Sequence, residues 1–259
     1  MSHSLSSPVI ASHREPRSER GIALIVALMA MMMLMALGTA LILTTSTESK
    51  ITRNFRNTSE GFYAADAVLE RAMDDILTIH DWNNLLSGAA QSAFIDGPPA
   101  GTRTLADGKA LDLGEIINDA NCQKATACSA SDLVFPFPGR PWGANNPVWK
   151  PFAWGFLRDI TPTATVNSSF YVVAMVADDP SENDGNPLMD GVGSNPGSGV
   201  ISMRAEAFGP FGAHKLIELT LRHLVFGTGG KVEIFGDSAD YNNSIAQSGV
   251  RILSWREVR

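Results

Sequence analysis

One loop of the sequence carries the residue types best suited to bind a metal ion. The segment DDPSENDGNPLMDGVGSNPGSG, residues 178–199, holds five carboxylates among asparagines, glycines and prolines. Carboxylate and amide oxygens are the ligands of Ca²⁺, so the candidate ligands are Asp178, Asp179, Glu182, Asp184 and Asp190. The spacing is not that of an EF-hand, because placing Gly185 at its invariant glycine puts Pro180 at the first ligand position. A solvated acidic linker is the simpler interpretation.

Two cysteines, Cys122 and Cys128 in NCQKATAC, offer a second kind of chemistry. They are too few for a zinc site, and no histidine lies at ligand spacing from them. In an exported segment we expect a disulfide, and a loop this short stabilises by at most ~3 kcal/mol. In a cytosolic segment the two thiols would stay unpaired.

Catalytic motifs are missing from the sequence. The five histidines form no H-E-x-x-H pair, GVGSNPGSG contains no G-x-S-x-G, and there is no phosphate-binding or dinucleotide fingerprint. The net charge is −7, which leaves no basic footprint for a nucleic acid. We therefore expect neither an enzyme nor a nucleic-acid-binding protein.

A long apolar stretch near the N-terminus determines where the rest of the chain lies relative to a membrane. Residues 22–43 contain 22 residues without a charge, and as a helix they would span ~33 Å, enough for a bilayer core of ~30 Å. The stretch exceeds the ~7–15 apolar residues of a cleaved secretory signal and lacks an A-x-A ending. Basic residues flank the stretch on both sides, so the charges do not decide its orientation in the membrane. We infer a cytoplasmic N-terminus because the soluble bulk of the chain and both cysteines lie after the stretch. Gly38 is a weak point of this helix, since glycine costs ~1 kcal/mol relative to alanine.

The helix is expected to continue through residues 44–79, which contain no proline. Apolar side chains recur there at steps of three, four and seven, which is the pattern of one apolar stripe on a helix: Ile51, Phe55, Phe62, Ala65, Leu69, Ala72, Met73 and Ile76. A helix with such a stripe needs a globular partner to cover it.

The remainder of the chain supplies that partner. Residues 80–165 are rich in loop signals, and their prolines keep them out of central strands. Six aromatic residues are interleaved with these prolines: Phe135, Phe137, Trp142, Trp149, Phe152 and Trp154. They could form an exposed surface for a partner or a glycan, or they could pack onto the sheet. We prefer packing onto the sheet. Strand patterns follow at 168–178, 199–209, 214–226 and 249–259. They predict three or four antiparallel strands with one apolar face.

Three pieces of the N-terminal region together resemble the PilX-type minor pilins of type IV pili. They are RGIALIVALMAMMMLMALG, RNFRN at 53–57 and GFYAADAVLE at 61–70. Asp66 stands where the family usually has glutamate. The resemblance covers about residues 20–77 and implies that a prepilin peptidase cuts between Gly21 and Ile22. Residues 1–21 would then be a cytoplasmic leader, and Ile22 an N-methylated first residue.

The resemblance also makes one departure informative. Major pilins carry a glutamate five residues into the mature chain, which pairs with the free amine of a subunit already incorporated, but here that position is Val26. An unpaired buried charge costs several kcal/mol. A subunit without the carboxylate is therefore expected at the tip or in an initiation complex rather than along the shaft.

These observations predict an α+β, pilin-like fold, with a long N-terminal α-helix, transmembrane in its first half, packed on a small antiparallel β-sheet. The expected parts are a leader (1–21), a membrane and filament-core helix (22–43), an amphipathic continuation (44–79) and a periplasmic domain (80–259). The predicted function is a minor pilin that initiates or caps pilus assembly and promotes adhesion or aggregation. The predicted location is the bacterial inner membrane, and the pilus or cell surface after assembly.

The expected partners are other minor and major pilins, the assembly platform, the prepilin peptidase and the inner membrane. Two alternatives remain open at this point. One is the tip pseudopilin of a type II secretion system, and the other is a single-pass periplasmic binding protein. No cofactor is expected apart from the candidate Ca²⁺.

Overall fold

The computed structural model describes residues 19–161, 166–182, 185–192, 195–196, 199–225, 232–234, 237–239 and 248–258. The chain divides into two compact units, one up to Arg53 and one from Asn54 onward. Each unit is described by itself.

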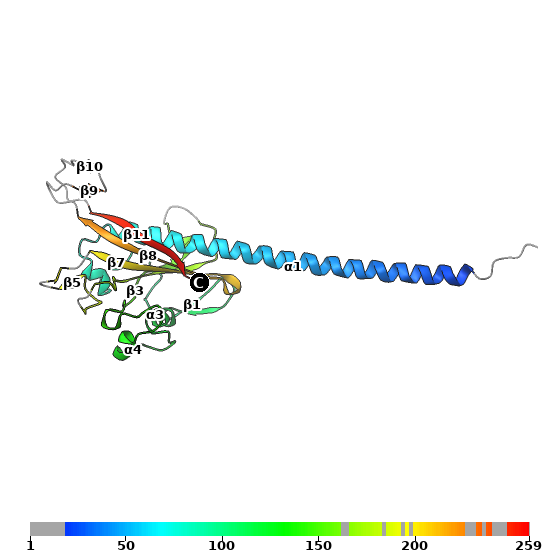
Figure 1. The fold of residues 1–259 in the computed structure, drawn as a ribbon, viewed down its shortest axis with the longest axis horizontal. Coiled ribbons are helices and arrows are strands. Elements are labelled where there is room, and N and C mark those ends of the chain that lie inside the picture. The colour runs from blue at the N-terminus through cyan, green and yellow to red at the C-terminus, as the bar shows by residue number, and fades with distance from the viewer. Residues whose placement is uncertain are drawn as a thin grey trace, which may run out of the picture. The chain divides into compact units, whose positions relative to one another are not determined.

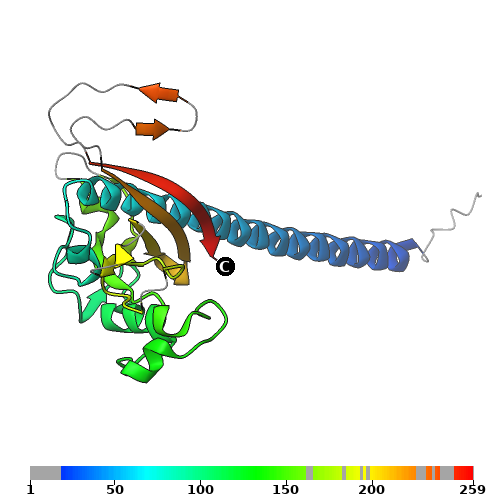
Figure 2. The same ribbon diagram turned by 60° about the vertical axis from the view of Figure 1, so that its left-hand side comes forward.

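The secondary structure begins with one long helix and continues with short helices and β-strands (Figures 1 and 2). The α-helices are α1 (Glu19–Ile76), α2 (Asn83–Leu86), α3 (Leu113–Cys122) and α4 (Ala130–Val134). The 3₁₀ turns are η1 (Gly143–Asn145), η2 (Leu157–Asp159) and η3 (Pro210–Gly212). The strands are β1 (Thr102–Thr104), β2 (Ala110–Asp112), β3 (Lys150–Phe156), β4 (Tyr171–Asp178), β5 (Gly191–Val192), β6 (Asn195–Pro196), β7 (Val200–Phe208), β8 (His214–Val225), β9 (Val232–Ile234), β10 (Asp237–Ala239) and β11 (Ser248–Val258).

The main sheet has five antiparallel strands in the order β11-β8-β7-β4-β3. The strand with a proline, β3, lies at one edge, and its pairing with β4 shifts register next to Pro151 because proline cannot donate to the ladder. Residues 92–96 run along the outer edge of β3, where Ser92 N–H donates to Phe152 O and Trp154 N–H to Phe94 O. At the other edge, β11 shifts register between Ile252 and Ser254. The predicted α+β architecture is confirmed, with one strand more than the expected three or four.

The C-terminal part of α1 packs on one face of this sheet, as Figures 1 and 2 show. The side chains it buries combine three alanines with larger aliphatic residues and a methionine: Ala64, Ala65, Val68, Leu69, Ala72, Met73 and Ile76. On the sheet, alternate residues of each strand pack against these side chains, among them Val172, Ala174 and Val176 of β4. This face therefore forms the larger hydrophobic core.

The helix and the sheet pack tightly around Phe170, which is fully buried. A Cβ at Gly61 of α1 would lie 3.0 Å from the Phe170 ring, and a Cβ at Gly209 would lie 2.3 Å from it. Both positions thus need glycine to accommodate this ring. Beside it, the Ser168 hydroxyl donates to Glu60 Oε1 at 2.9 Å and ties the strand entry to the helix.

The opposite face of β4 is covered by α3 and the segments around it (Figure 1). Tyr171, Val173 and Met175 point to this side and pack with Trp149, Trp154 and α3. Since β4 is buried on both faces along its whole length, it reads as a continuous apolar run rather than an alternating one. The layer that covers this second face of the sheet is formed by residues 80–165, for which the sequence had indicated mainly loops.

The apolar stripe expected along residues 44–79 is buried only in part. Ile51 and Phe55 are exposed, whereas burial begins with Phe62. The helix ends at Ile76 rather than at residue 79. Asp75 lies at this end and accepts hydrogen bonds from the Ser92 hydroxyl and from Ala93 N–H. The segment that borders β3 is thereby attached to the end of α1.

Replacing Phe170 by alanine is expected to destabilise the protein by about 3–5 kcal/mol, because it empties a buried aromatic site. The matched control is Phe135→Ala, since the Phe135 side chain is 64% exposed and such a change should stay within about 0.5 kcal/mol. Denaturant unfolding of the full chain in detergent, followed by circular dichroism, measures both. Equal unfolding midpoints for the two variants would contradict this packing.

Candidate functional site

The apolar N-terminal segment of α1 is helical throughout and exposes its large side chains within the first unit. In the described part of the chain, α1 is the one helix that is long and apolar enough to cross a membrane, by length and composition. The exposed side chains are aliphatic or methionine, which pack well against lipid or against other helices: Ile22, Leu24, Ile25, Val26, Leu28, Met29, Met31, Met32, Met33, Leu34, Met35, Leu37, Leu41, Ile42 and Leu43.

Hydroxyl side chains toward the end of this segment satisfy their own hydrogen bonds. Each donates to a backbone carbonyl three or four residues earlier, for example Thr44 Oγ1 to Ala40 O at 2.9 Å and Thr47 Oγ1 to Leu43 O at 2.9 Å. Thr39, Thr45, Ser46 and Ser49 follow the same pattern. Because a hydroxyl bonded in this way needs no external partner, the segment can enter an apolar environment without leaving these groups unsatisfied.

The positions that the sequence singled out for processing and assembly lie at the start of α1. Gly21 and Ile22 belong to its first turns, and Val26 follows one turn later with an exposed side chain. Gly38 lies in the middle of the segment, where an added Cβ would meet nothing within 4 Å. Thus no contact in the structure requires glycine at this position, and its role as a weak point stays a prediction.

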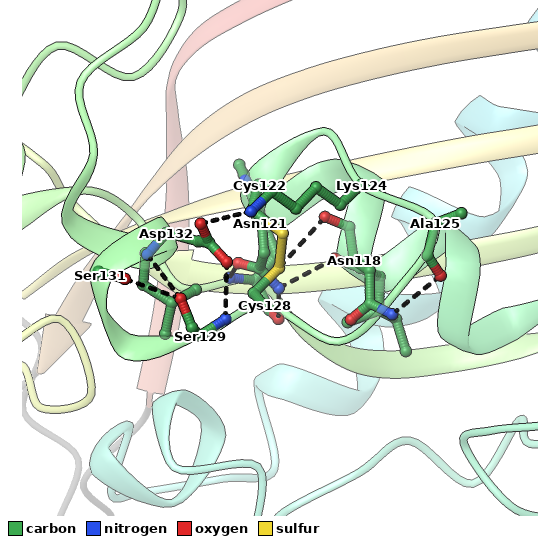
Figure 3. Close-up of a disulfide and its surroundings, with 12 residues drawn as sticks. Asn118, Asn121, Cys122, Lys124, Ala125, Cys128, Ser129, Ser131 and Asp132 are labelled. Carbon is green, nitrogen blue, oxygen red and sulfur yellow. Dashed lines mark hydrogen bonds and ion pairs between the residues drawn. A yellow bond between two sulfur atoms is a disulfide. The ribbon is translucent and has the colours of Figure 1, made fainter.

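The two cysteines form a disulfide at the C-terminal end of α3 (Figure 3). Cys122 is the last residue of α3, and the chain turns at Gln123, which has a left-handed φ of 56°. The Cα atoms of Cys122 and Cys128 are 6.0 Å apart. The bridge therefore closes a six-residue separation and brings the start of α4 back to the helix.

Polar contacts hold both sides of this bridge (Figure 3). Ser129 and Asp132 form a capping box at the N-terminus of α4, and Lys124 Nζ reaches Asp132 Oδ1 at 2.5 Å. The hydrogen bond from Lys124, together with those from Ser129, lowers the pKa of Asp132 to about 2. On the buried side, Asn121 exchanges two hydrogen bonds with the Trp149 backbone, at 3.0 and 2.8 Å. The disulfide loop is thus anchored to the Pro-rich segment.

The structure brings together three of the five candidate calcium ligands. Oxygens of Asp178, Glu182 and Asp190 lie within 4.8 Å of one another, and Asp178 is 4% exposed. The Asp179 carboxylate instead accepts hydrogen bonds from the Ser181 hydroxyl and backbone, and Asp184 lies outside the described residues. Asp190 is held in place by its own N–H, which donates to Asn83 Oδ1, and by Gly199 N–H, which donates to its carboxylate.

The histidines of the sheet have structural partners. His214 Nε2 lies 2.8 Å from Glu206 Oε2, and its ring stacks on Phe208. Burial alone raises the pKa of Glu206, but hydrogen bonds and charges from His214 and Arg204 outweigh it and hold that pKa below its ordinary value. His223 stacks on Trp82, and burial together with the charge of His80 lowers its pKa.

Sequence reasoning missed a polar cleft on the sheet face opposite α1. Its floor includes a chain of ion pairs in which Glu218 accepts from Arg204 of β7 and from Arg256 of β11. The alternation in MRAEAF and LIELTLR was visible in the sequence. The sequence does not reveal that β7, β8 and β11 are neighbours in the sheet, because a long connection separates β8 from β11 along the chain.

The long N-terminal helix packed on an antiparallel sheet defines the architecture of the type IV pilin class. A comparison with protein families finds that residues 20–70 match the family described as PilX N-terminal. The match covers this part of the chain alone, and it supports the resemblance of residues 20–70 to the N-terminal region of PilX-type minor pilins. Neither the curated proteins nor the solved structures gave a match to the chain.

Calcium binding stays a prediction, now focused on three carboxylates. We expect a saturable heat when the full chain is titrated with CaCl₂, with a Kd in the range of about 10⁻⁴–10⁻³ M typical of extracellular modules. Asp190→Asn should weaken binding about tenfold, or 1.4 kcal/mol, since it removes a charge but keeps the oxygen that accepts from Gly199. Asp179→Asn is the control and should bind as wild type. No heat at millimolar Ca²⁺ would end the idea.

Proposed function

We propose that this minor pilin acts at low copy at or near the tip of the filament, where it initiates or caps assembly and contributes to adhesion or aggregation. The observation that carries the proposal is the absence of any carboxylate between residues 22 and 43 of the sequence, with Val26 at the fifth position of the mature chain. The side chains on this part of α1 are exposed and apolar, as expected for a surface that exchanges lipid for neighbouring helices.

The physical reason concerns the positive charge of a mature N-terminus among apolar helices. A subunit that enters beneath another brings its helix next to an amine that is already buried there. Without a carboxylate to pair with, that amine remains a buried charge, which costs several kcal/mol. At the distal end no earlier subunit presents such an amine. A subunit with Val26 is therefore tolerated best as the first one added, at the distal end.

Membrane insertion precedes assembly in this proposal. Residues 1–21 form the cytoplasmic leader, α1 crosses the inner membrane once, and the sheet-containing unit lies in the periplasm, where its disulfide is stable. The prepilin peptidase then cuts between Gly21 and Ile22, and the assembly platform passes the subunit to other minor and major pilins. A tip pseudopilin of a type II secretion system would share each of these steps.

N-terminal sequencing of the membrane-extracted protein tests the processing step. We expect the mature chain to begin at Ile22, with a methylated amine, because a glycine before the cut lets an active site approach the backbone closely. Gly21→Val should abolish this start. A wild-type chain that begins at Met1 or Ser2 would favour a plain single-pass anchor over both filament functions.

Replacing Val26 by glutamate tests the tip position directly. We expect Val26→Glu to move a tagged subunit from filament ends into the shaft, because the new carboxylate can pair with the buried amine. If the new ion pair stabilises the subunit in the shaft by 1.4 kcal/mol, the ratio of shaft-associated to tip-associated label rises about tenfold. Immunogold counts along purified filaments measure it, and Val26→Gln, of similar length but neutral, is the control. Wild-type label spread evenly along filaments would contradict the proposal.

A further inference from the structure

The cleft on the sheet face opposite α1 has the dimensions of a ligand site. Its volume is about 540 Å³, within the 300–1,000 Å³ usual for small-molecule sites. The floor is formed by β7, β8 and β11, and the walls by the end of α3 and by the Pro-rich segment between Phe137 and Trp149. The second layer thus covers β3 and β4 with a hydrophobic core but leaves this half of the sheet open.

The floor consists of two rows of polar side chains that run across the three strands. In the first row, Ser202, Thr220 and Ser254 occupy directly paired positions, and the Ser254 hydroxyl donates to Thr220 Oγ1 at 3.0 Å. The second row pairs Arg204, Glu218 and Arg256 in the same way. Since adjacent strands lie about 4.8 Å apart, each row spans about 10 Å. A line of hydroxyls thus lies beside an Arg–Glu–Arg row in which both guanidinium groups pair with Glu218.

The wall opposite this floor is held rigidly by a buried arginine. Arg140 is 4% exposed, and its Nη2 donates to Pro147 O at 2.7 Å and to Leu133 O at 3.3 Å. Burial lowers its pKa to about 10, so it remains charged at neutral pH. Trp142 N–H donates to Asn146 Oδ1 at 3.0 Å. The loop backbone is held in this way at Trp142, whose side chain is 43% exposed and lines the cleft.

The charges that line the cleft cancel. Its three arginines, Arg140, Arg204 and Arg256, face three acids, Asp119, Asp179 and Glu218. A cleft without net charge offers no general attraction to an anion or a cation. What it offers instead is hydroxyl groups, which both donate and accept, guanidinium groups and two partly exposed aromatic rings, Phe137 and Trp142.

We propose that this cleft binds a neutral oligosaccharide. A sugar ring has hydroxyls on its rim, which match the Ser202–Thr220–Ser254 row, and an apolar face, which matches the Trp142 indole. The site is separate from the apolar segment of α1 that carries the proposed assembly function, and it does not depend on the position of the subunit in a filament. It would give the subunit a contact with a glycan surface.

Calorimetric titration of the full chain tests this, in a detergent without a sugar headgroup. The probes are cellotetraose, maltotetraose and the N-acetylglucosamine tetramer chitotetraose. We expect at least one to bind with a Kd below about 1 mM, and Trp142→Ala to weaken that binding about tenfold, or 1.4 kcal/mol. Thr220→Val keeps the shape of the side chain but removes its hydroxyl, and it should weaken binding about fivefold, because a sugar hydroxyl then lacks its partner.

Phe135→Ala is the matched control, since Phe135 is an exposed aromatic two residues before Phe137 that does not line the cleft. It should bind like wild type, and all variants should keep the wild-type unfolding midpoint. Three outcomes would overturn the proposal: no heat with any of the three sugars at 10-fold the expected Kd (about 10 mM), binding that Trp142→Ala and Thr220→Val leave unchanged, or tighter binding of tetragalacturonate, an acidic sugar, than of every neutral probe.

Discussion

The close packing of α1 against the antiparallel sheet is the constraint on which the rest of the second unit depends. On the buried side of the helix, alanines and Gly61 leave room for the Phe170 ring, which also packs closely against Gly209. The apolar face of the sheet has no other helix of comparable length among the described residues to cover it. Without this contact both the helix stripe and the face of β4, β7 and β8 would be open to water. An apolar surface of that size is where most of the free energy of folding resides.

The use of one sheet face by α1 determines what the other face can do. Because the core on the α1 side already stabilises the strands, the opposite side can be divided between a second, smaller core and a polar cleft. The smaller core sits over β3 and β4, where α3 and Trp149 cover Val173 and Met175. Over β7, β8 and β11 the side chains are polar and paired with one another across the strands. The disulfide and Arg140 then fix the boundary between the two halves, since both hold the segment that leaves α3.

The sequence predicted those parts of the fold that follow from local pattern and not those that follow from strand order. The unbroken apolar and amphipathic pattern through residues 22–76 predicted α1. The alternation of apolar and polar residues predicted β7 and β8. The helix α3 was not predicted, although Leu113, Ile116, Ile117 and Ala120 recur at helical spacing after the N-cap Asp112, because the loop signals on both sides of it were given more weight. Exposure of Ile51 and Phe55 was likewise unpredictable, since a stripe in the sequence does not say how far its cover extends. The carboxylates of Asp178 and Asp190 were singled out, but only the fold shows that they meet while Asp179 binds Ser181 instead.

The same helix carries two apolar surfaces of different chemistry, and this difference separates folding from assembly. The buried surface between Ala64 and Ile76 is made of small and branched residues that match a fixed set of strands. The exposed surface between Ile22 and Leu43 is made largely of methionine, leucine and alanine, which adapt to irregular neighbours. Its hydroxyls are bonded within the helix, so neither lipid nor a bundle of helices has to supply a partner. A surface of this kind distinguishes poorly between lipid and protein, and the choice between them is left to charge. For that reason the proposed position in the filament depends more on the lack of a carboxylate at Val26 than on any of the apolar residues around it.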